Sequence, residues 1–237
     1  MLTERKGRPL LTLSGPFVRG TMIGRPNRFT VIAEINGEVV KAYLPNPGRL
    51  PYLVPGARLL VARKSGGKLS YEVFLAFDGD VPVTVDSRLA NRVFESCVSK
   101  GYLRDLRGYG VEREVTIDGS KIDFLLRGKE GAVYVEVKSC TYVDRGTAMF
   151  PDRQTERGRR HLRLLQGLRE RGHDCAIVFV IQRPDARLFA PFREVDPGFA
   201  GLLKEALGRG LMGISFSTLF DVDSRTIYFL REVPVSV

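Results

Sequence analysis

The sequence predicts two domains: an amino-terminal β barrel of the oligonucleotide-binding (OB-fold-like) type over residues 1–85, and an α/β domain with a mixed sheet over residues 86–237. Three observations predict this division. Short runs of alternating apolar residues fill the first part, with no helical period. The apolar spacing becomes helical directly after Asp86, and a later helix leads into a continuous apolar strand. With 43% hydrophobic and 27% charged residues, the chain has the composition of an ordinary globular protein with a packed core.

The barrel is predicted from about five short strands in some 70 residues, which is typical of a small barrel of this type. Apolar and polar residues alternate from Phe29 to Ile35, and Asn36-Gly37 then supplies a tight hairpin turn. The expected strands lie at 29–35, 38–44, 58–64, 69–77 and 81–85, with a second turn at 65–68.

The second domain mixes strands and helices. Three consecutive strands are expected to form a meander, and a helix followed by a fully apolar strand is expected to form a crossover unit. The expected helices lie at 89–98, 155–171 and 197–208, and the expected strands lie at 111–117, 122–126, 132–139, 176–181, 212–219 and 226–230.

The net charge of +10 indicates a polyanionic partner, because lysine and arginine gain affinity by displacing counterions from phosphates. Residues 1–85 hold 12 basic and 6 acidic residues, so the barrel is disproportionately basic. The three cysteines are odd in number and far apart in sequence, which favours reduced core thiols over disulfides or a zinc site. No apolar run suits a membrane helix or a signal peptide, so we expect a cytoplasmic protein with no membrane partner.

One hairpin carries the strongest chemical signal. Alternation along the strand from Val133 to Lys138 places three valines on one face and Glu136 and Lys138 on the other. A symmetric turn before this strand would place Asp123 directly opposite Glu136, with Cβ atoms about 4.5–5.5 Å apart. The apolar residues of the preceding strand, which are expected to share the buried face, are Ile122, Phe124 and Leu126.

Two facing carboxylates, Asp123 and Glu136, repel each other unless something offsets their charge. Mg²⁺ would do so, with Mn²⁺ as a substitute, because it prefers oxygen ligands and commonly uses one or two carboxylates, several waters and substrate phosphate. Lys138 would then orient the attacking water or stabilise charge developing on the phosphoryl oxygens. Glu114 and Glu95 are candidate outer metal ligands.

The alternative interpretation of the hairpin is a solvated face. Lys121 and Lys138 would then form diagonal salt bridges with Glu136 and Asp123, as alternating charges on exposed strands often do.

Two further segments suit phosphate. The segment from Phe150 to Arg163 is rich in cations beside a helix start, and both helix N-termini and arginine favour phosphate. The rigid loop from Leu44 to Leu50 would expose backbone amides and the Arg49 guanidinium. The alternative for the segment from Phe150 to Arg163 is a solvated charged face. The alternative for the loop from Leu44 to Leu50 is an ordinary barrel turn.

Taken together and in this order, these segments resemble the sugar fermentation stimulation protein A family, and the resemblance spans nearly the whole chain. The matching residues are Pro45-Asn46-Pro47-Gly48-Arg49, Leu89-Ala90-Asn91-Arg92, Lys121-Ile122-Asp123-Phe124, Glu136-Val137-Lys138-Ser139, Phe150-Pro151-Asp152, Thr155-Glu156-Arg157-Gly158 and His161-Leu162.

The resemblance implies an oligonucleotide-binding barrel joined to a nuclease-like domain of the PD-(D/E)xK type, and it implies DNA binding. It assigns Asp123 and Glu136 to the two motif acids and Lys138 to the motif lysine, whereas Ile122 stands where such motifs place a proline. The residues that we expect to contact DNA are Asn46, Arg49, Asn91, Arg92, Arg157, Arg160 and His161.

The leading hypothesis is therefore a Mg²⁺-dependent nuclease acting on single- or double-stranded DNA, with no small-molecule cofactor. The alternative is a non-catalytic DNA-binding regulator, of sugar-use genes by the family's name, that retains a nuclease fold. A small-molecule sugar enzyme is a third reading, which predicts ligand binding that does not depend on salt.

Overall fold

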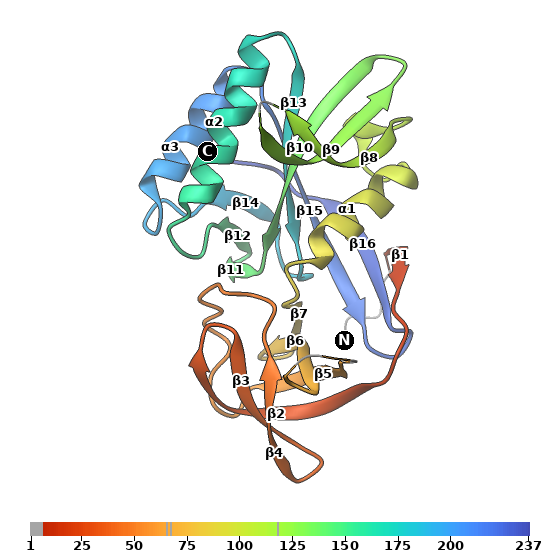
Figure 1. Cartoon of the computed structure of the whole chain (residues 1–237), viewed down its shortest axis with the longest axis vertical. Coiled ribbons are helices and arrows are strands. Elements are labelled where there is room, and N and C mark those ends of the chain that lie inside the picture. Colours follow the sequence, from red (N-terminus) through yellow and green to blue (C-terminus); the bar gives the residue numbers. More distant parts are fainter. Residues whose placement is uncertain (1–6, 65, 67, 118) are drawn as a thin grey trace.

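The computed structural model describes residues 7–64, 66, 68–117 and 119–237. Residues 65 and 67 of the turn expected at 65–68 lie outside the described residues. The barrel forms one end of the molecule and the α/β domain forms the other (Figure 1).

The barrel consists of β2 (Phe17–Asn27), β3 (Thr30–Ile35), β4 (Glu38–Tyr43), β5 (Arg58–Arg63), β6 (Tyr71–Asp78) and β7 (Val81–Thr84). The strand order is β4-β3-β2-β5-β6-β7, and β4 also pairs with β6. This extra pairing closes five strands into a barrel whose interior holds Met22, Val31, Ala33, Leu59 and Val61, among others. The predicted barrel is confirmed, although the predicted strands omit β2, and β7 lies outside the five strands that close.

The α/β domain is built on a seven-stranded sheet in the order β1-β16-β15-β13-β10-β9-β8. Its strands are β1 (Arg8–Thr12), β8 (Gly110–Ile117), β9 (Ser120–Gly128), β10 (Gly131–Cys140), β13 (Asp174–Ile181), β15 (Met212–Asp221) and β16 (Thr226–Glu232). The pairs β10–β13 and β13–β15 are parallel, and the other pairs are antiparallel. The expected meander, crossover unit and mixed sheet are all present.

The first described strand belongs to this large sheet. β1 pairs with β16, with Arg8 opposite Phe229 and Thr12 opposite Thr226, although these residues precede the barrel in sequence. Phe74 of the barrel packs on Phe17 and Phe220, with each pair of ring centroids 4.7 Å apart. The two domains therefore share apolar contacts.

Helices cover both faces of the large sheet (Figure 1). The helices are α1 (Leu89–Ser99), α2 (Glu156–Glu170) and α3 (Pro197–Gly208), with a short 3₁₀ helix, η1 (Arg104–Leu106). The apolar side of α1 packs in one core with Val133, Val135 and Val137. The apolar sides of α2 and α3 pack in a second core across the sheet.

Side-chain caps fix where α2 and α3 begin. Thr155 Oγ1 accepts a hydrogen bond of 3.0 Å from the Gly158 N–H, and Asp196 Oδ1 accepts one of 2.9 Å from the Phe199 N–H. Asp196 Oδ2 also accepts from the Thr155 N–H at 2.9 Å. The starts of the two helices are thereby tied together.

A small second sheet, which the sequence did not predict, lies beside the end of β10. It consists of β11 (Tyr142–Asp144), β12 (Thr147–Phe150) and β14 (Leu188–Pro191). A cis peptide bond joins Phe150 to Pro151 directly after β12. These strands bring residues 142–152 next to the barrel loop of residues 45–49.

Polar contacts also hold the domains together. The Thr84 N–H donates to the Gln182 carbonyl at 3.0 Å, and within the second domain Gln182 Nε2 donates to the Asp86 carbonyl, just after the barrel, at 3.1 Å. Arg183, whose side chain is 3% exposed, pairs with Asp78 of the barrel at 3.0 Å. Within the described ranges, no helix combines the length and apolar character needed to cross a membrane.

Candidate active site and nucleic-acid interface

The predicted register of the β9–β10 hairpin is confirmed. Val133 pairs with Leu126 and Val135 pairs with Phe124, so the next residues in the same register are Glu136 and Asp123. The ladder ends at the Val135–Phe124 pair, and the Val137 N–H donates to Asp123 Oδ2 at 2.9 Å. The Asp123 carboxylate thus replaces a backbone carbonyl as the acceptor at the point where β9 and β10 separate.

The face predicted for Ile122 is wrong. Phe124 packs in the core under α1, whereas Ile122 packs in the core on the opposite side of the sheet, under α2. The pairing between β8 and β9 omits Glu114 opposite Asp123, and Glu114 has a positive φ of 52°. The flanking pairs, Arg113–Phe124 and Val115–Ile122, keep one register, so the change of face occurs at the unpaired position without an inserted residue, and simple alternation does not anticipate it.

Asp123 is held by two neutral donors. Its Oδ1 accepts a hydrogen bond of 3.1 Å from Asn91 Nδ2 on α1, and its Oδ2 accepts from the Val137 N–H. Burial, followed by the nearby Glu136 carboxylate, raises the pKa of Asp123 above its ordinary value. The carboxylate therefore favours any additional positive charge that approaches it.

Glu136 is 3% exposed and contacts two donors, Lys138 Nζ and His161 Nδ1. Arg157 Nε donates to His161 Nε2 at 3.4 Å, which assigns the ring proton to Nδ1 and makes His161 a donor to Glu136. Burial raises the pKa of Glu136, but Lys138 and His161 together outweigh burial, so this pKa lies below its ordinary value. Glu136 is anionic and fixed in position.

The interpretation of the hairpin as a solvated salt-bridged face is wrong. Lys138 does pair with Glu136, but their side chains are only 12% and 4% exposed. Lys121, which that interpretation paired diagonally with Glu136, lies 3.9 Å from Glu114 instead.

These groups line a cavity of about 400 Å³ between the two domains. Its walls come from the barrel loop, from the end of β10, from the small second sheet and from the start of α2. The polar residues that line it include Asn46, Ser87, Asp123, Glu136, Lys138, Ser139, Thr141, Asp152, Thr155 and Arg157.

The barrel loop is held rigidly against the second domain. Arg25 donates to the carbonyl oxygens of Gly48 and Arg49 at 2.9 and 3.0 Å, and Asn46 Oδ1 accepts from the Gly48 N–H at 2.9 Å. The Arg49 N–H donates to Asp152 Oδ2 at 3.0 Å. A Cβ at position 48 would overlap the Asp152 carboxylate, so only glycine permits this approach.

The structure brings together Asn91, Asp123, Glu136, Lys138, Arg157 and His161 at this cavity and its wall. Asn46 is 8% exposed, and its Nδ2 donates to the Val85 carbonyl at 3.1 Å, so it shapes the loop. The side chains of Arg49, Arg92 and Arg160 are exposed.

The two candidate outer ligands lie elsewhere. The Glu95 carboxylate pairs with Arg113, and Glu114 lies beside Lys121 with 79% of its side chain exposed. Neither lines the cavity. Among the described residues, no cluster of three or more histidine, cysteine, aspartate or glutamate side chains suits a metal ion.

Sequence reasoning missed two residues at the site, Asp152 and Arg25. Asp152 lines the cavity and receives the Arg49 N–H, and Arg25 organises the barrel loop. The Phe150-Pro151-Asp152 motif was a signal for Asp152, because an acidic residue directly precedes the cation-rich start of a helix. Arg25 had no such signal, because its partners are backbone carbonyls.

Asp123 and Glu136 fit a divalent cation. Their carboxylates face one cavity, Asp123 has only neutral donors, and its pKa is raised in part by Glu136. Two carboxylates suffice for Mg²⁺, which retains several waters.

The fold and the site define a class: a five-stranded oligonucleotide-binding barrel joined to an α/β domain of the PD-(D/E)xK nuclease-like type. The family model described as "SfsA N-terminal OB domain" matches residues 23–85, and the one described as "Sugar fermentation stimulation protein RE domain" matches residues 88–224. The chain belongs to the sugar fermentation stimulation protein (SfsA) family.

Relatives and a solved structure match almost the whole chain. The sugar fermentation stimulation protein homolog of Moorella thermoacetica is 42% identical over 96% of this chain and 100% of its own length. The homolog of Caldanaerobacter subterraneus subsp. tengcongensis is 40% identical over 95% of this chain and 99% of its own. The structure of Pyrococcus furiosus SfsA in complex with Ca²⁺ is similar with a TM-score of 0.90, at 31% identity, covering 97% of this chain and 99% of that one.

Proposed function

We propose that this protein binds DNA in the cytoplasm and hydrolyses its phosphodiester bonds in a reaction that requires Mg²⁺. One observation carries the proposal: Asp123, Glu136 and Lys138 line one cavity, and the two acids lie in register on neighbouring strands. Two carboxylates and an adjacent amine are the side chains that metal-assisted phosphodiester hydrolysis needs.

Asp123 and Glu136 would hold the cation. Bound there, Mg²⁺ would supply Lewis-acid polarisation of a phosphoryl oxygen and ionisation of a water. Asn91 and the Val137 N–H orient Asp123, while His161 and Lys138 orient Glu136. Such outer contacts fix the direction of a ligand's lone pairs before a cation arrives.

Lys138 contributes positive charge beside the reacting phosphate. Its side chain is 12% exposed and lines the cavity, so its charge is poorly screened by water. It stabilises negative charge that develops on the phosphoryl oxygens as the water attacks.

Two further observations support the proposal. The net charge of +10 favours a polyanion, and Arg157 lines the same cavity as the acids. The relative from Pyrococcus furiosus has been solved in complex with Ca²⁺, a divalent cation that also prefers oxygen ligands.

The test is cleavage of labelled single- and double-stranded DNA by the purified chain with Mg²⁺, with Mn²⁺ and with EDTA. We expect cleavage with the metals and none with EDTA. Asp123→Ala should abolish cleavage, and Lys138→Met should lower kcat by about 100-fold or more. The matched control is Asp144→Ala, which removes an exposed carboxylate of β11 outside the cavity and should leave cleavage unchanged.

DNA that stays intact under all metal conditions would contradict catalysis. Asp123→Ala should still bind DNA, because the cations that attract phosphate remain. Cleavage that persists in Asp123→Ala at the wild-type rate would indicate a contaminant or a different site.

A second candidate is a DNA-binding protein without turnover. One observation favours it: Glu136 already contacts Lys138 and His161, so its charge is balanced without a cation. Calorimetry separates the two candidates. Heat of Mg²⁺ binding that is lost in Asp123→Ala supports the enzyme, and DNA binding without any metal heat supports the non-catalytic protein.

A further inference from the structure

A second groove lies beside the catalytic cavity. It has a volume of about 430 Å³ and runs between the start of β9 and the inner side of α2, where Lys121, Arg157 and Arg160 line it together with His161. Arg157 also lines the catalytic cavity, and His161 contacts Glu136. The groove and the cavity therefore lie next to each other at Arg157, which lines both.

The charge of this groove is strongly one-sided. Three cationic side chains line it, and no described acidic residue does. Arg160 is exposed and has no ion-pair partner within the described part of the chain. The Lys121–Glu114 pair is 3.9 Å apart with both side chains more than three-quarters exposed, so it neutralises little of the Lys121 charge.

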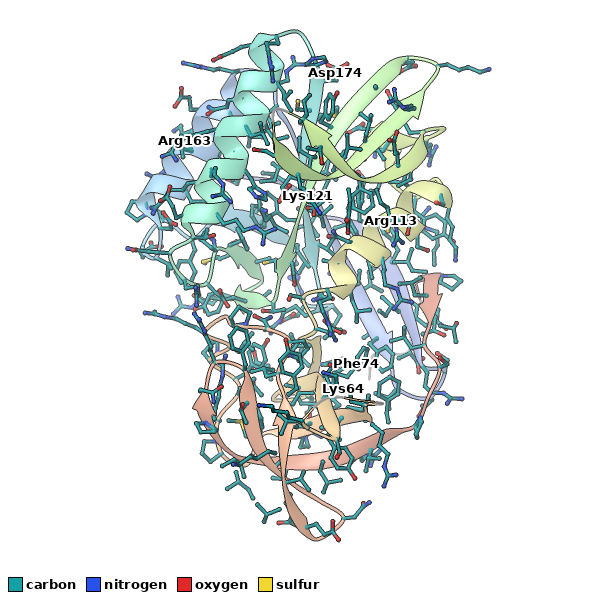
Figure 2. The ribbon with its side chains drawn as sticks, in the orientation of Figure 1. Lys64, Phe74, Arg113, Lys121, Arg163 and Asp174 are labelled. Atoms are coloured by element: carbon teal, nitrogen blue, oxygen red, sulfur yellow. The ribbon has the colours of Figure 1, made fainter. Side chains whose placement is uncertain are left out.

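The other side of α2 is different. Arg159 and Arg163 both pair with Glu156, at 2.8 and 3.4 Å, and Arg159 also pairs with Asp196. Figure 2 shows Arg163 on the outer side of α2 and Lys121 between that helix and the hairpin. Uncompensated cations on this helix thus face the groove.

The size of the cavity favours a single strand. The barrel loop and Asp152 are joined by the Arg49 N–H bond, and the loop forms one wall of the cavity. A cavity of about 400 Å³ between two joined domains has the size of a small-ligand pocket, which suits a nucleotide of a single strand better than a base-paired duplex.

We propose that the groove of Lys121, Arg157 and Arg160 binds the phosphodiester backbone of a single DNA strand on one side of the bond held at Asp123 and Glu136. The inference rests on the proposed function and adds its substrate class, which is single-stranded or unpaired DNA. Arg160 supplies a planar donor fork to one phosphate, and Lys121 supplies a compact charge to another.

The test measures how binding depends on salt. A labelled single strand long enough to fill both the cavity and the groove is titrated with protein in EDTA, which prevents cleavage, at several NaCl concentrations. For single strands each phosphate contact contributes about 0.7 to the slope of log Kd against log salt. The double variant K121Q/R160Q should therefore lower the slope by about 1.4, from two lost contacts.

The control variant R163Q/K129Q removes the same total charge. Arg163 lies on the outer side of α2, and Lys129 is exposed at the tip of the β9–β10 turn, so neither lines the groove. Its slope should equal that of the wild type. A blunt duplex of the same sequence should bind wild-type protein about 10-fold more weakly or worse.

The outcomes separate the two proposals. Wild-type protein that binds neither DNA would overturn the proposed function itself. If wild-type protein binds a single strand but K121Q/R160Q keeps the full slope of log Kd against log salt, only the proposal for the groove is overturned. The same holds if the control variant R163Q/K129Q loses as much slope as K121Q/R160Q. A duplex bound as tightly as the single strand would overturn the assigned substrate class.

Discussion

The backbone N–H of Arg49, in the barrel, donates a hydrogen bond of 3.0 Å to Oδ2 of Asp152, which is 103 residues away in the α/β domain. Gly48 lies against the same carboxylate. Burial raises the pKa of Asp152, and the Arg49 N–H, Arg153 and Arg25 only partly oppose this effect. The contact joins the two domains at the wall of the cavity. Because Asp152 is buried there, ionisation of its carboxyl group is unfavourable.

The first prediction concerns the charge of Asp152. Its pKa in the folded protein exceeds the ordinary value of 3.8, so the folded state holds the proton more tightly than the unfolded state. The free energy of unfolding therefore falls as pH rises through the window above 3.8 and stays lower at neutral pH. Asp152→Asn keeps an acceptor for Arg49 without the charge and should raise the melting temperature at neutral pH.

Thermal unfolding over a range of pH measures this effect. The advantage of Asp152→Asn should disappear as pH falls toward 3.8, where the wild-type carboxyl is also neutral. Asp152→Ala should instead destabilise by about 1–3 kcal/mol, because the Arg49 N–H loses its acceptor. An Asp152→Asn protein that is less stable than wild type at every pH would contradict the assignment.

The second prediction concerns Gly48. A methyl group there would overlap the Asp152 carboxylate, and the loop is fixed on its other side by Arg25. Gly48→Ala should lower the free energy of unfolding by about 1–3 kcal/mol, as overpacking does, measured by urea denaturation. Gly201→Ala is the matched control, because a Cβ at Gly201 of α3 meets nothing within 4 Å. It should stabilise by about 1 kcal/mol through helix propensity.

The third prediction concerns Asn91, which orients Asp123 from α1. Asn91→Ala removes the 3.1 Å hydrogen bond to Asp123 Oδ1 without touching the carboxylate itself. Loss of such an orienting contact should weaken Mg²⁺ binding by roughly 10- to 100-fold, measured by calorimetry. Ser99→Ala, at the exposed end of the same helix, should bind Mg²⁺ as the wild type does. Equal affinity in both variants would show that the hydrogen bond does not position Asp123.

The fourth prediction concerns the thiols. All three cysteines are free and buried, and burial raises the pKa of Cys140 and Cys175 to about 12. Because the thiolate is the reactive form, native protein at about pH 8 should not react with iodoacetamide, and denatured protein should take up three equivalents. Ser99→Cys should add one reactive thiol to the native protein. Rapid labelling of wild-type native protein would contradict the buried placement.

Much of the fold was predictable because it depends on neighbours in sequence. The turn chemistry of Asn36-Gly37 fixed the first barrel hairpin, and a symmetric turn fixed the β9–β10 register that places Asp123 opposite Glu136. The apolar period placed α1 and α2 within a few residues of their ends. The same local patterns placed Glu136 and Lys138 on one strand face, whereas their assignment to a metal site came from the basic context and the family resemblance and stays a prediction.

Other features required contacts between distant residues. Strand alternation failed at Ile122, beside the position where the β8–β9 ladder lacks its Glu114–Asp123 pair, and no neighbouring residue signals the positive φ of Glu114. The small sheet of β11, β12 and β14 was missed because its strands have three or four residues each and gain stability only from packing. His161 reached Glu136 only because α2 packs on β13, the strand next to β10.

By itself, the sequence determined the three helices, most strands of the barrel and of the large sheet, the basic character and the register of one acid against another, since these follow from period, turn chemistry and charge. Only the tertiary structure decided that β1 joins the sheet of the second domain, that the Arg49 N–H meets Asp152, and that Glu136 is buried beside His161. These contacts join residues that are far apart along the chain. Their geometry is set by how the domains and helices pack, which local patterns do not encode.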